Sequence, residues 1–377
     1  MKKIVFLTGT RADFGKLKSL IEITEKSKRY EVHIFVTGMH MNPKYGKTAD
    51  EVIKCGYKNI FMYYNHDTHD PMDIILAKTI VGFTEYINDI KPDLIVLHGD
   101  RVEALAGAIV GALNNVLTAH IEGGELSGTV DELIRHSVSK MCHIHFVSNN
   151  TARRRLIQMG EEKNSIFVIG SPDIDIMMSK KFAPLNFIKK HYNIPFKKYA
   201  VLLFHPVVTE HSDTGRQARN LVDAVLKSKL DYVVIYPNND TGSDFIFSEY
   251  KRLQASPHIR MFPSIRFEYF LVLLRQANFI IGNSSVGVRE APYYGIPVVN
   301  IGTRQNNRHL HPDMINCGYA SAQILAAIEK ALSAKPKPGG HFGKGNSDRL
   351  FLKILDQGKL WLVNKQKQFR DIPGPDK

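Results

Sequence analysis

Short apolar runs alternate with stretches of helical spacing along residues 1–170. In the stretches between the runs, such as residues 16–27 and 103–113, apolar side chains recur three and four positions apart, which predicts helices. Strand, helix and strand repeated at this interval is typical of a parallel, doubly wound sheet. The strands that we predict in this half are residues 3–7, 31–36, 94–97, 117–121, 143–147 and 166–169.

The same pattern restarts after Gly170-Ser171-Pro172, where we place a domain boundary. The chain therefore predicts an α/β protein with two Rossmann-like, doubly wound domains, residues 1–170 and 171–355, that face each other across a cleft. Residues 356–377 are predicted as a C-terminal basic helix or tail that packs back on the first domain, and helical spacing over residues 349–363 favours a closing helix. The strands predicted in the second domain are residues 200–204, 232–236, 259–262, 279–281 and 298–301.

Composition places the chain among ordinary globular proteins. Its 377 residues are 44% hydrophobic and 23% charged, and this length suggests two or three domains. No apolar run approaches the roughly 18 residues of a membrane span, and the run over residues 4–7 is too short for a signal peptide. The three cysteines have no paired spacing, which argues against a disulfide framework and suits a reducing compartment. We therefore expect a cytoplasmic protein with no membrane partner.

The net charge of +13 is unevenly distributed. Residues 1–170 hold 21 Lys and Arg against 20 Asp and Glu, whereas residues 171–377 hold 29 against 17. A basic chain raises the hypothesis of a nucleic-acid partner, but the tail lacks alternating basic and aromatic residues and no nucleic-acid-binding motif is present. We therefore interpret the excess as a solvated surface that favours anionic small molecules, and we expect no nucleic-acid partner.

Carboxylates follow several predicted strands, at the edge where open parallel sheets bind ligands. Asp100, Glu122 and Asp131 lie at strand ends or in the loop just beyond. Helix capping, or pairing with Arg101 or Arg135, would account for any one of them. Three of them near one cleft favour acid–base chemistry, because neighbouring, partly desolvated carboxylates have raised pKa values. No Cys or His cluster with metal spacing accompanies them, so we predict no metal site.

The turn after the first strand suits an anionic phosphate. Gly9, Arg11, Gly15 and Lys16 open the following helix, and a helix N-terminus with a nearby arginine attracts phosphate. The spacing of a dinucleotide-binding turn is incomplete, and an ordinary strand-to-helix turn remains the alternative. We therefore predict no nicotinamide cofactor, and no cofactor of any kind.

The segment Gly282–Pro292 is a more specific phosphate signal, because it leads from a predicted strand into a helix with two hydroxyls in the first turn. Backbone N–H groups there, with Ser284 and Ser285, suit a diphosphate, and Glu290 suits a ribose diol. A serine cap followed by a helical glutamate is the structural alternative. His205 ends a strand beside the cleft, and as an imidazolium it would balance a leaving diphosphate.

Two long runs, His98–Ala106 and His120–His136, resemble the hydrolysing UDP-N-acetylglucosamine 2-epimerases of sialic acid synthesis. The resemblance extends from Thr8 to about Arg308 and includes residues 237–242, 282–292 and 302–305. Non-hydrolysing epimerases typically carry Gly-Gln-His and Glu-Ala-Gly where this chain has Gly38-Met39-His40 and Glu122-Gly123-Gly124. These departures favour the hydrolysing branch.

The resemblance implies two domains of glycosyltransferase-B type that release UDP and N-acetylmannosamine from UDP-N-acetylglucosamine by elimination to a glycal and hydration. It also implies a homodimer or higher homo-oligomer. The first domain would carry the catalytic carboxylates and the second would bind UDP. The residues that it implies are Asp100, Glu122 and Asp131 as catalytic carboxylates, His205 as a catalytic acid or diphosphate ligand, and Arg11, Arg101, Asn238, Ser284, Ser285, Glu290 and Arg304 as UDP contacts.

Three alternatives remain open from the sequence. Related enzymes act on a UDP-diacetamido-trideoxyhexose in legionaminic acid routes, so the sugar is not decided. A glycosyltransferase on the same plan would need an acceptor and would leave C2 of the sugar untouched. A binding module without turnover would tolerate amide replacement of all three carboxylates.

Overall fold

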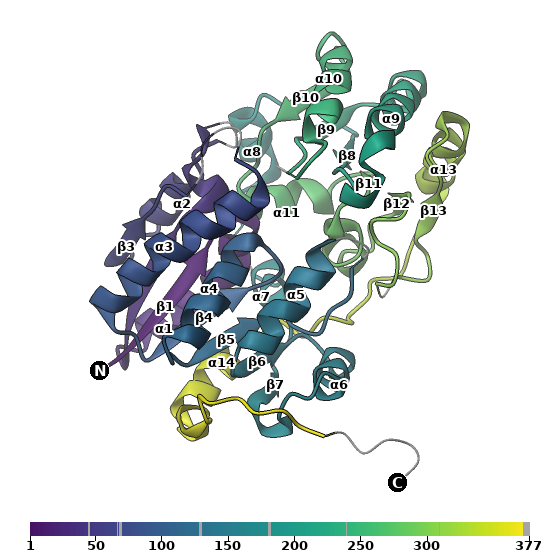
Figure 1. Cartoon of the computed structure of the whole chain (residues 1–377). Helices are drawn as coiled ribbons and strands as arrows, with labels where there is room; N and C mark the ends of the chain where they lie inside the picture. Colours follow the sequence, from purple (N-terminus) through teal and green to yellow (C-terminus); the bar gives the residue numbers. More distant parts are fainter. Residues whose placement is uncertain are drawn as a thin grey trace. The chain divides into compact units, whose positions relative to one another are not determined.

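The computed structural model consists of two compact α/β units, each built on one parallel sheet (Figure 1). Unit 1 comprises residues 1–125, 131–178 and 341–377, and unit 2 comprises residues 126–130 and 179–340. The residues that the structure describes are 1–43, 46–65, 67, 70–127, 130–179, 182–238, 240–308 and 310–371.

The sheet of unit 1 has seven strands in the order β3-β2-β1-β4-β5-β6-β7. The inner strand β1 is buried on both faces, because Ile4, Val5 and Phe6 are all fully inaccessible to solvent, as parallel sheets covered by helices require. The strands are β1 (Lys2–Thr8), β2 (Tyr30–Val36), β3 (Asn59–Met62), β4 (Leu94–His98), β5 (Thr118–Ile121), β6 (Ile144–Val147) and β7 (Ile166–Val168).

Helices cover both faces of this sheet. The side chain of Phe6 points to the face covered by α1, whereas a Cβ added to Gly107 of α4 would lie 3.2 Å from Leu7 on the opposite face. The helices are α1 (Arg11–Lys26), α2 (Ala49–Lys54), α3 (Met72–Ile90), α4 (Val102–Leu113), α5 (Val130–Met141), α6 (Asn150–Gln158), α7 (Pro172–Met177) and α14 (Ser347–Asp356), with short 3-10 turns η1 (Gly38–Met41), η3 (Lys163–Ser165) and η6 (Lys359–Leu362).

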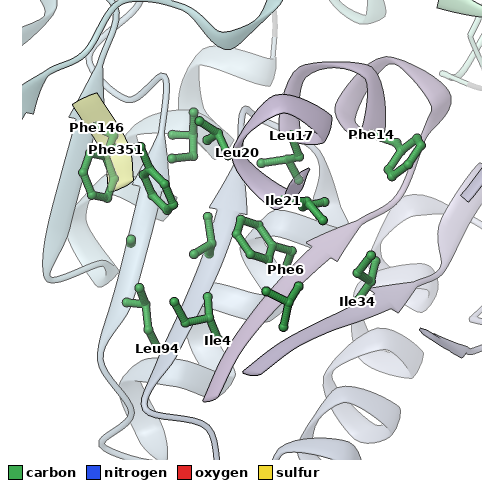
Figure 2. Packing of buried hydrophobic residues seen from close by; sticks show 14 of the residues in the cluster. Ile4, Phe6, Phe14, Leu17, Leu20, Ile21, Ile34, Leu94, Phe146 and Phe351 are labelled. Carbon is green, nitrogen blue, oxygen red and sulfur yellow. The ribbon is translucent and has the colours of Figure 1, made fainter. Parts of the chain in front are cut away.

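Helix α14 belongs to the core of unit 1, although its residues are last in the chain. The ring of Phe351 is fully buried and lies 4.8 Å from that of Phe146 and 6.3 Å from that of Phe6, centroid to centroid (Figure 2). Asp175 holds the start of the helix, since its carboxylate accepts from the backbone N–H groups of Ser347, at 2.8 Å, and Asp348, at 2.9 Å.

The domain boundaries therefore differ from those expected from the sequence. Residues 171–178 and 341–355, which we assigned to the second domain, are part of unit 1. The physical reason is apolar burial, because α14 completes the hydrophobic cluster that α1 forms on the sheet of unit 1. The helical spacing over residues 349–363 corresponds to two pieces, α14 and η6, separated at Gly358, whose φ of +77° ends the helix. Residues 372–377 of the predicted tail lie outside the described residues.

Unit 2 repeats the plan with six parallel strands in the order β10-β9-β8-β11-β12-β13. Side chains of α9, α10 and α13 form its main hydrophobic cluster with the strands. The strands are β8 (Ala200–Leu203), β9 (Tyr232–Ile235), β10 (Ile259–Phe262), β11 (Ile280–Gly282), β12 (Val298–Ile301) and β13 (Ile315–Cys317). The helices are α8 (Leu185–His191), α9 (Thr214–Ser228), α10 (Ser243–Gln254), α11 (Phe267–Arg275), α12 (Glu290–Tyr293) and α13 (Ser321–Ser333), with η4 (Val208–Asp213) and η5 (Ser285–Gly287).

The prediction of two doubly wound α/β sheets is confirmed, and the predicted strands all occur within one or two residues of their expected bounds. Two strands were missed, β3 and β13, and each lies at one edge of its sheet. Both are short and partly exposed, so neither has the continuous apolar run of a central strand. Within the described part of the chain, no helix is long and apolar enough to cross a membrane.

Candidate functional site

The carboxyl end of the unit 1 sheet has a switch point between β1 and β4, where successive strands are added in opposite directions. Loops open at such a point, and ligands of doubly wound sheets bind there. The turn Gly9–Arg11 follows β1, and Gly99–Arg101 follows β4. Gly99 has a φ of +75°, which turns the chain sharply between His98 and Asp100.

Glu122, directly after β5, is held in an unusual conformation. Its φ of +65° is rare for a residue with a side chain, and its N–H donates to Phe146 O at 2.8 Å. The side chain is buried, with one oxygen accepting from Ser171 Oγ and the other 3.2 Å from His98 Nε2 and 3.7 Å from Lys16 Nζ. Strained backbone at a buried carboxylate is typical of a functional site.

His98, the last residue of β4, lies between two carboxylates. Its Nδ1 is 3.2 Å from Asp13 Oδ1, and its Nε2 is 3.2 Å from Glu122 Oε2. Burial alone would lower the pKa of His98, but the hydrogen bonds with Asp13 and Glu122 outweigh it and raise that pKa above 6.5. Both ring nitrogens face carboxylate oxygens, an arrangement that favours the doubly protonated ring.

Arg135 of α5 links two of the three residues predicted as catalytic carboxylates, one through its carboxylate and the other through its backbone carbonyl. Its Nη2 donates to the carboxylate of Asp100, and its Nη1 donates to the backbone carbonyl of Glu122 at 3.0 Å. The arginine is buried, whereas the Asp100 side chain is partly exposed, so the pair is only partly shielded from solvent. Asp131, the third predicted carboxylate, lies one turn earlier on α5 and is buried as well. The structure thus brings Asp100 and Glu122 together and puts Asp131 on the helix that holds both.

A second histidine supports the loop that carries Asp100. His120 Nε2 donates to Gly99 O at 2.8 Å, and its Nδ1 accepts from Ser139 Oγ at 2.9 Å. Burial lowers the pKa of His120 to about 3, so the ring is neutral. Gly123 packs against this pair, because a Cβ there would lie 2.7 Å from Ser139 Oγ and 2.8 Å from His120 Nδ1.

Arg11 and Arg101, which the resemblance implied as UDP contacts, are both engaged with carboxylates of unit 1. Arg11 Nη2 lies 2.5 Å from Glu51 Oε1, and Arg101 Nε lies 4.0 Å from Glu103 Oε2. The other residues implied as UDP contacts all belong to unit 2. The residues predicted as UDP contacts are therefore divided between the two units.

The switch point of unit 2 lies between β8 and β11. His205 lies just beyond β8, and Asn283 lies just beyond β11. The Asn283 amide accepts from His205 N at 2.7 Å and donates to His205 O at 2.8 Å. His205 Nδ1 accepts from the N–H of Asn238 at 3.0 Å. In this arrangement Nδ1 is an acceptor, which leaves Nε2 as the ring's donor.

The segment after β11 is joined by hydrogen bonds to residues that follow β12. The carbonyl of Asn283 accepts from Gln305 Nε2 at 2.6 Å and from Arg304 Nη1 at 3.4 Å. Gly282 has a φ of +136°, and a Cβ there would lie 1.7 Å from Leu203 O, so only glycine fits. Ser284 accepts from Val286 N at 3.4 Å.

The single helix that we predicted over this segment is instead η5, which starts at Ser285, and α12, which starts at the buried Glu290. Earlier in unit 2, after β9, Asn238 Nδ2 donates to Asp240 at 2.5 Å. Asn239, between them, lies outside the described residues.

Several site residues were not identified from the sequence. His98 ends a strand as His205 does, and this shared position was the available signal. Arg135 was considered only as a partner that would make a carboxylate structural, and that pairing with Asp100 does occur. Asn283 had no signal beyond its place after a strand. Among the described residues, no group of three or more His, Cys, Asp or Glu is arranged to hold a metal ion.

Two Rossmann-like sheets, each with polar side chains at its switch point, define a fold of glycosyltransferase-B type. The crystal structure of UDP-GlcNAc 2-epimerase from Neisseria meningitidis bound to UDP-GlcNAc has this fold, with a TM-score of 0.79 over 94% of this chain and 100% of that one at 17% identity. The Methanocaldococcus jannaschii enzyme in complex with UDP-GlcNAc and UDP gives a TM-score of 0.76 over 95% of this chain and 100% of that one at 20% identity.

The sequence model of UDP-N-acetylglucosamine 2-epimerase matches residues 22–356, and this chain belongs to that family. A UDP-N-acetylglucosamine 2-epimerase of Neisseria meningitidis is 46% identical over 99% of this chain and 100% of its own length. A hydrolysing UDP-N,N'-diacetylbacillosamine 2-epimerase of Legionella pneumophila is 35% identical over 94% of this chain and 96% of its own. The polysialic acid biosynthesis protein P7 of Escherichia coli is 29% identical over 99% and 97%. The family resemblance read from the sequence is confirmed.

Proposed function

We propose that the protein is a hydrolysing UDP-N-acetylglucosamine 2-epimerase that converts UDP-N-acetylglucosamine and water into N-acetylmannosamine and UDP, the first step of sialic acid biosynthesis. The observation that carries the proposal is the carboxylate site of unit 1, where one buried guanidinium, that of Arg135, joins Asp100 to the backbone of Glu122. The 46% identity to an enzyme named for this substrate supports it, as do the relatives named as hydrolysing.

The reaction needs several carboxylates because C2 of the sugar carries no acidic proton. No carbonyl adjoins C2, so the anomeric C–O bond must break first and leave an oxocarbenium-like centre. UDP departs with the electron pair of that bond, the C2 proton leaves from the opposite face, and a glycal remains. Water then adds across the double bond, with its oxygen at C1 and a proton delivered to C2 in the inverted configuration. Positioned acids and bases typically contribute 10²–10⁴-fold to such steps.

The proposal divides these tasks among the carboxylates of unit 1. Asp100 would stabilise the cationic centre or take the C2 proton during elimination, whereas Glu122 and Asp131 would act mainly in hydration. His98 adds a proton-bearing partner for Glu122, because it is held between Glu122 and Asp13, which raise its pKa. A proton that Glu122 gains or loses during the reaction could therefore be shared with His98 through their hydrogen bond.

Unit 2 would hold the leaving group. Backbone N–H groups near Ser284 and Ser285, together with Arg304, suit the diphosphate, while Glu290 suits the ribose diol. His205 would donate from Nε2 to a diphosphate oxygen, since Nδ1 already accepts from Asn238 N. Asn238 would be a further uridine diphosphate contact, and Arg11 and Arg101 would act from unit 1.

The test is to incubate the protein with UDP-N-acetylglucosamine in deuterated water, without acceptor or added metal, and to follow products by NMR. UDP together with N-acetylmannosamine deuterated at C2 is the expected result. Strict dependence of UDP release on an added acceptor would instead indicate a glycosyltransferase. Binding of UDP without any turnover would indicate a binding module.

A UDP-diacetamido-trideoxyhexose is the second candidate substrate, and the 35% identity to the Legionella enzyme favours it. The two sugars differ at C4 and C6, far from the bond that breaks, so the same carboxylates would serve both. Comparing kcat/KM for the two UDP-sugars decides between them. The higher identity to the Neisseria enzyme leads us to expect at least a tenfold preference for UDP-N-acetylglucosamine, about 1.4 kcal/mol.

The proposal also includes a homodimer or higher homo-oligomer that works in the cytoplasm. Cys55, Cys142 and Cys317, which all lie in the described part of the chain, form no disulfide, which suits a reducing compartment. Light scattering on the purified protein measures the oligomeric state directly, and a monomeric mass at micromolar concentration would contradict this part of the proposal.

A further inference from the structure

The basic C-terminal tail, which has no part in the proposed reaction, is fastened to unit 1 beside β6. The carbonyl of Lys365 accepts from His143 Nε2 at 2.9 Å, and Arg370 Nη1 lies 3.2 Å from Glu162 Oε2. Between these two attachments, the side chain of Lys367 enters the protein. The tail is therefore ordered against the fold on both sides of Lys367.

The ammonium of Lys367 uses all three of its hydrogens. It donates to Lys140 O at 2.7 Å, to Cys142 O at 2.7 Å and to Glu161 Oε2 at 2.5 Å. Lys140 lies in the last turn of α5, and Cys142 follows directly after the helix. Carbonyls at the end of a helix have no partner within the helix, and a cation there also complements the helix dipole.

The carboxylate beneath Lys367 is fixed from two other directions. Glu161 is buried, and it accepts from His145 Nε2 at 2.9 Å and from Lys140 Nζ at 3.2 Å. Burial alone would raise the pKa of Glu161, but His145 and Lys367 outweigh it and lower that pKa to about 2. Glu161 is therefore ionised, and Lys367 is held between a buried anion and the end of α5.

Helix α5 carries site residues at its other end. Asp131 lies in its first turn, and Arg135 donates to Asp100 and to the backbone of Glu122. A helix is stiff along its axis, so a shift at Lys140 is transmitted to Arg135, which is less than two turns away. Displacements of about 1 Å at a reacting group typically cost up to a hundredfold in rate.

We propose that Lys367 is a positioning residue for the reaction: by capping the carboxyl end of α5, it fixes Asp131 and Arg135 relative to Asp100 and Glu122. The inference rests on the proposed function for its kinetic consequence, but its structural part concerns unit 1 alone. It gives the basic tail a role in hydration and elimination without any contact with the substrate.

The test compares Lys367→Met with Lys365→Met. Both remove one positive charge from the tail, but the exposed Lys365 contributes only its backbone carbonyl to the contact with His143, and the variant keeps that carbonyl. For Lys367→Met we expect kcat to fall about tenfold with KM unchanged within twofold, since unit 2 is untouched. Lys365→Met should retain wild-type kcat and KM. Equal kcat in both variants and the wild type would overturn the proposal.

A double variant separates positioning from stability. Lys367→Met leaves Glu161 as a buried anion with less compensation, which lowers the melting temperature. Adding Glu161→Gln removes that charge, so the melting temperature should rise again while kcat stays low, because the carbonyls at the end of α5 remain uncapped. Recovery of kcat together with the melting temperature would show that Lys367 acts only on stability and would overturn the proposal.

Hydrogen exchange supplies a readout that does not depend on the reaction. Backbone amides of α5 should exchange at least fivefold faster in Lys367→Met and in the double variant than in Lys365→Met. If α5 exchanges faster in Lys367→Met but the wild-type protein does not turn over UDP-N-acetylglucosamine, the proposed function is wrong and the capping of α5 by Lys367 still holds. If the wild-type protein is active and α5 exchanges at the same rate in Lys367→Met, only the positioning role of Lys367 is contradicted.

Discussion

Asn283 binds the backbone of His205 at both of its polar groups, accepting from the N–H at 2.7 Å and donating to the C=O at 2.8 Å. His205 follows β8 and Asn283 follows β11, so the pair joins the two loops at the switch point of unit 2. The carbonyl of Asn283 in turn accepts from Gln305 and Arg304. Through its side chain and its backbone carbonyl, Asn283 thus links three segments that we propose as the diphosphate site.

Replacing Asn283 by Ala should weaken UDP binding about tenfold, because two hydrogen bonds of about 1 kcal/mol each are lost and the loop gains freedom. Isothermal titration with UDP measures the effect. Asn300→Ala is the matched control, since Asn300 is also buried and bonds Asn316 at 2.8 Å between β12 and β13. The control should lose stability but keep its affinity for UDP. Equal losses of affinity in both variants would contradict the role given to Asn283.

Amide replacements test the division of labour among the carboxylates. Asp100→Asn should reduce UDP release by 10²–10⁴-fold, because elimination loses its charged group. Glu122→Gln and Asp131→Asn should still release UDP but should also liberate glycal, which NMR detects. If the latter two variants are folded and release no glycal, the proposed division is wrong. Glu132→Gln, next to Asp131 and paired with His136 at 3.6 Å, should remain active.

The charge of His98 makes stability depend on pH. Its pKa is raised above 6.5 in the folded protein, so it contributes stability that is fully present below pH 6.5 and is lost as pH rises through the folded-state pKa. Wild-type protein should therefore lose more stability than His98→Gln when pH is raised from 6.5. Urea unfolding at a series of pH values measures the difference.

The matched control for this experiment is His258→Gln. His258 also pairs with a carboxylate, Asp231 at 2.8 Å, but it is exposed to solvent. Its removal should leave the pH dependence of unfolding close to that of the wild type. A difference between wild type and His98→Gln that stays constant with pH would mean that His98 is not charged in the fold.

Gly123→Ala should destabilise unit 1 by about 1–3 kcal/mol, because the added Cβ would lie 2.7 Å from Ser139 Oγ and 2.8 Å from His120 Nδ1. Displacing His120 would also release the Gly99 carbonyl and with it the Asp100 loop, so kcat should fall. Gly215→Ala in α9 is the control, since its Cβ would meet nothing nearer than 3.8 Å. That variant should gain about 0.5–1 kcal/mol from helix propensity. Urea unfolding separates the two, and equal stability would refute the packing argument.

Phe351→Ala should cost about 3–5 kcal/mol of unfolding free energy, because the fully buried ring contacts Phe146 and Phe6. Phe369→Ala removes the same side chain from an exposed position, 88% accessible, and should change stability by less than about 0.5 kcal/mol. Thermal unfolding compares them. A small effect of Phe351→Ala would mean that α14 does not complete the core of unit 1.

Much of the fold could be predicted because parallel strands buried on both faces need continuous apolar runs. The run at Val298–Ile301 was predicted with the bounds that the structure has. The edge strands β3 and β13 were missed because both are short and partly exposed, so neither requires a continuous apolar run. The helix expected over 282–292 is instead two short helices, η5 and α12. The spacing of residues in the sequence does not show where a helix is interrupted.

The carboxylates of the site could be proposed from the sequence because residues after parallel strands must emerge at one edge of the sheet. Their partners could not be found in this way. Arg135 meets Asp100 across 35 positions, and His98 meets Asp13 across 85. Contacts at such separations depend on which strands are neighbours and how each helix lies on the sheet.

The sequence by itself therefore determined the alternation of strands and helices, the two sheets and the family to which the chain belongs, because these follow from local apolar periodicity and long motifs. Only the tertiary structure decided which charges meet. It put α14 into the core of unit 1, Lys367 against the end of α5, and His98 between two carboxylates that raise its pKa. Burial and the pairing of distant charges set these features, and neither quantity is a property of any short segment of the chain.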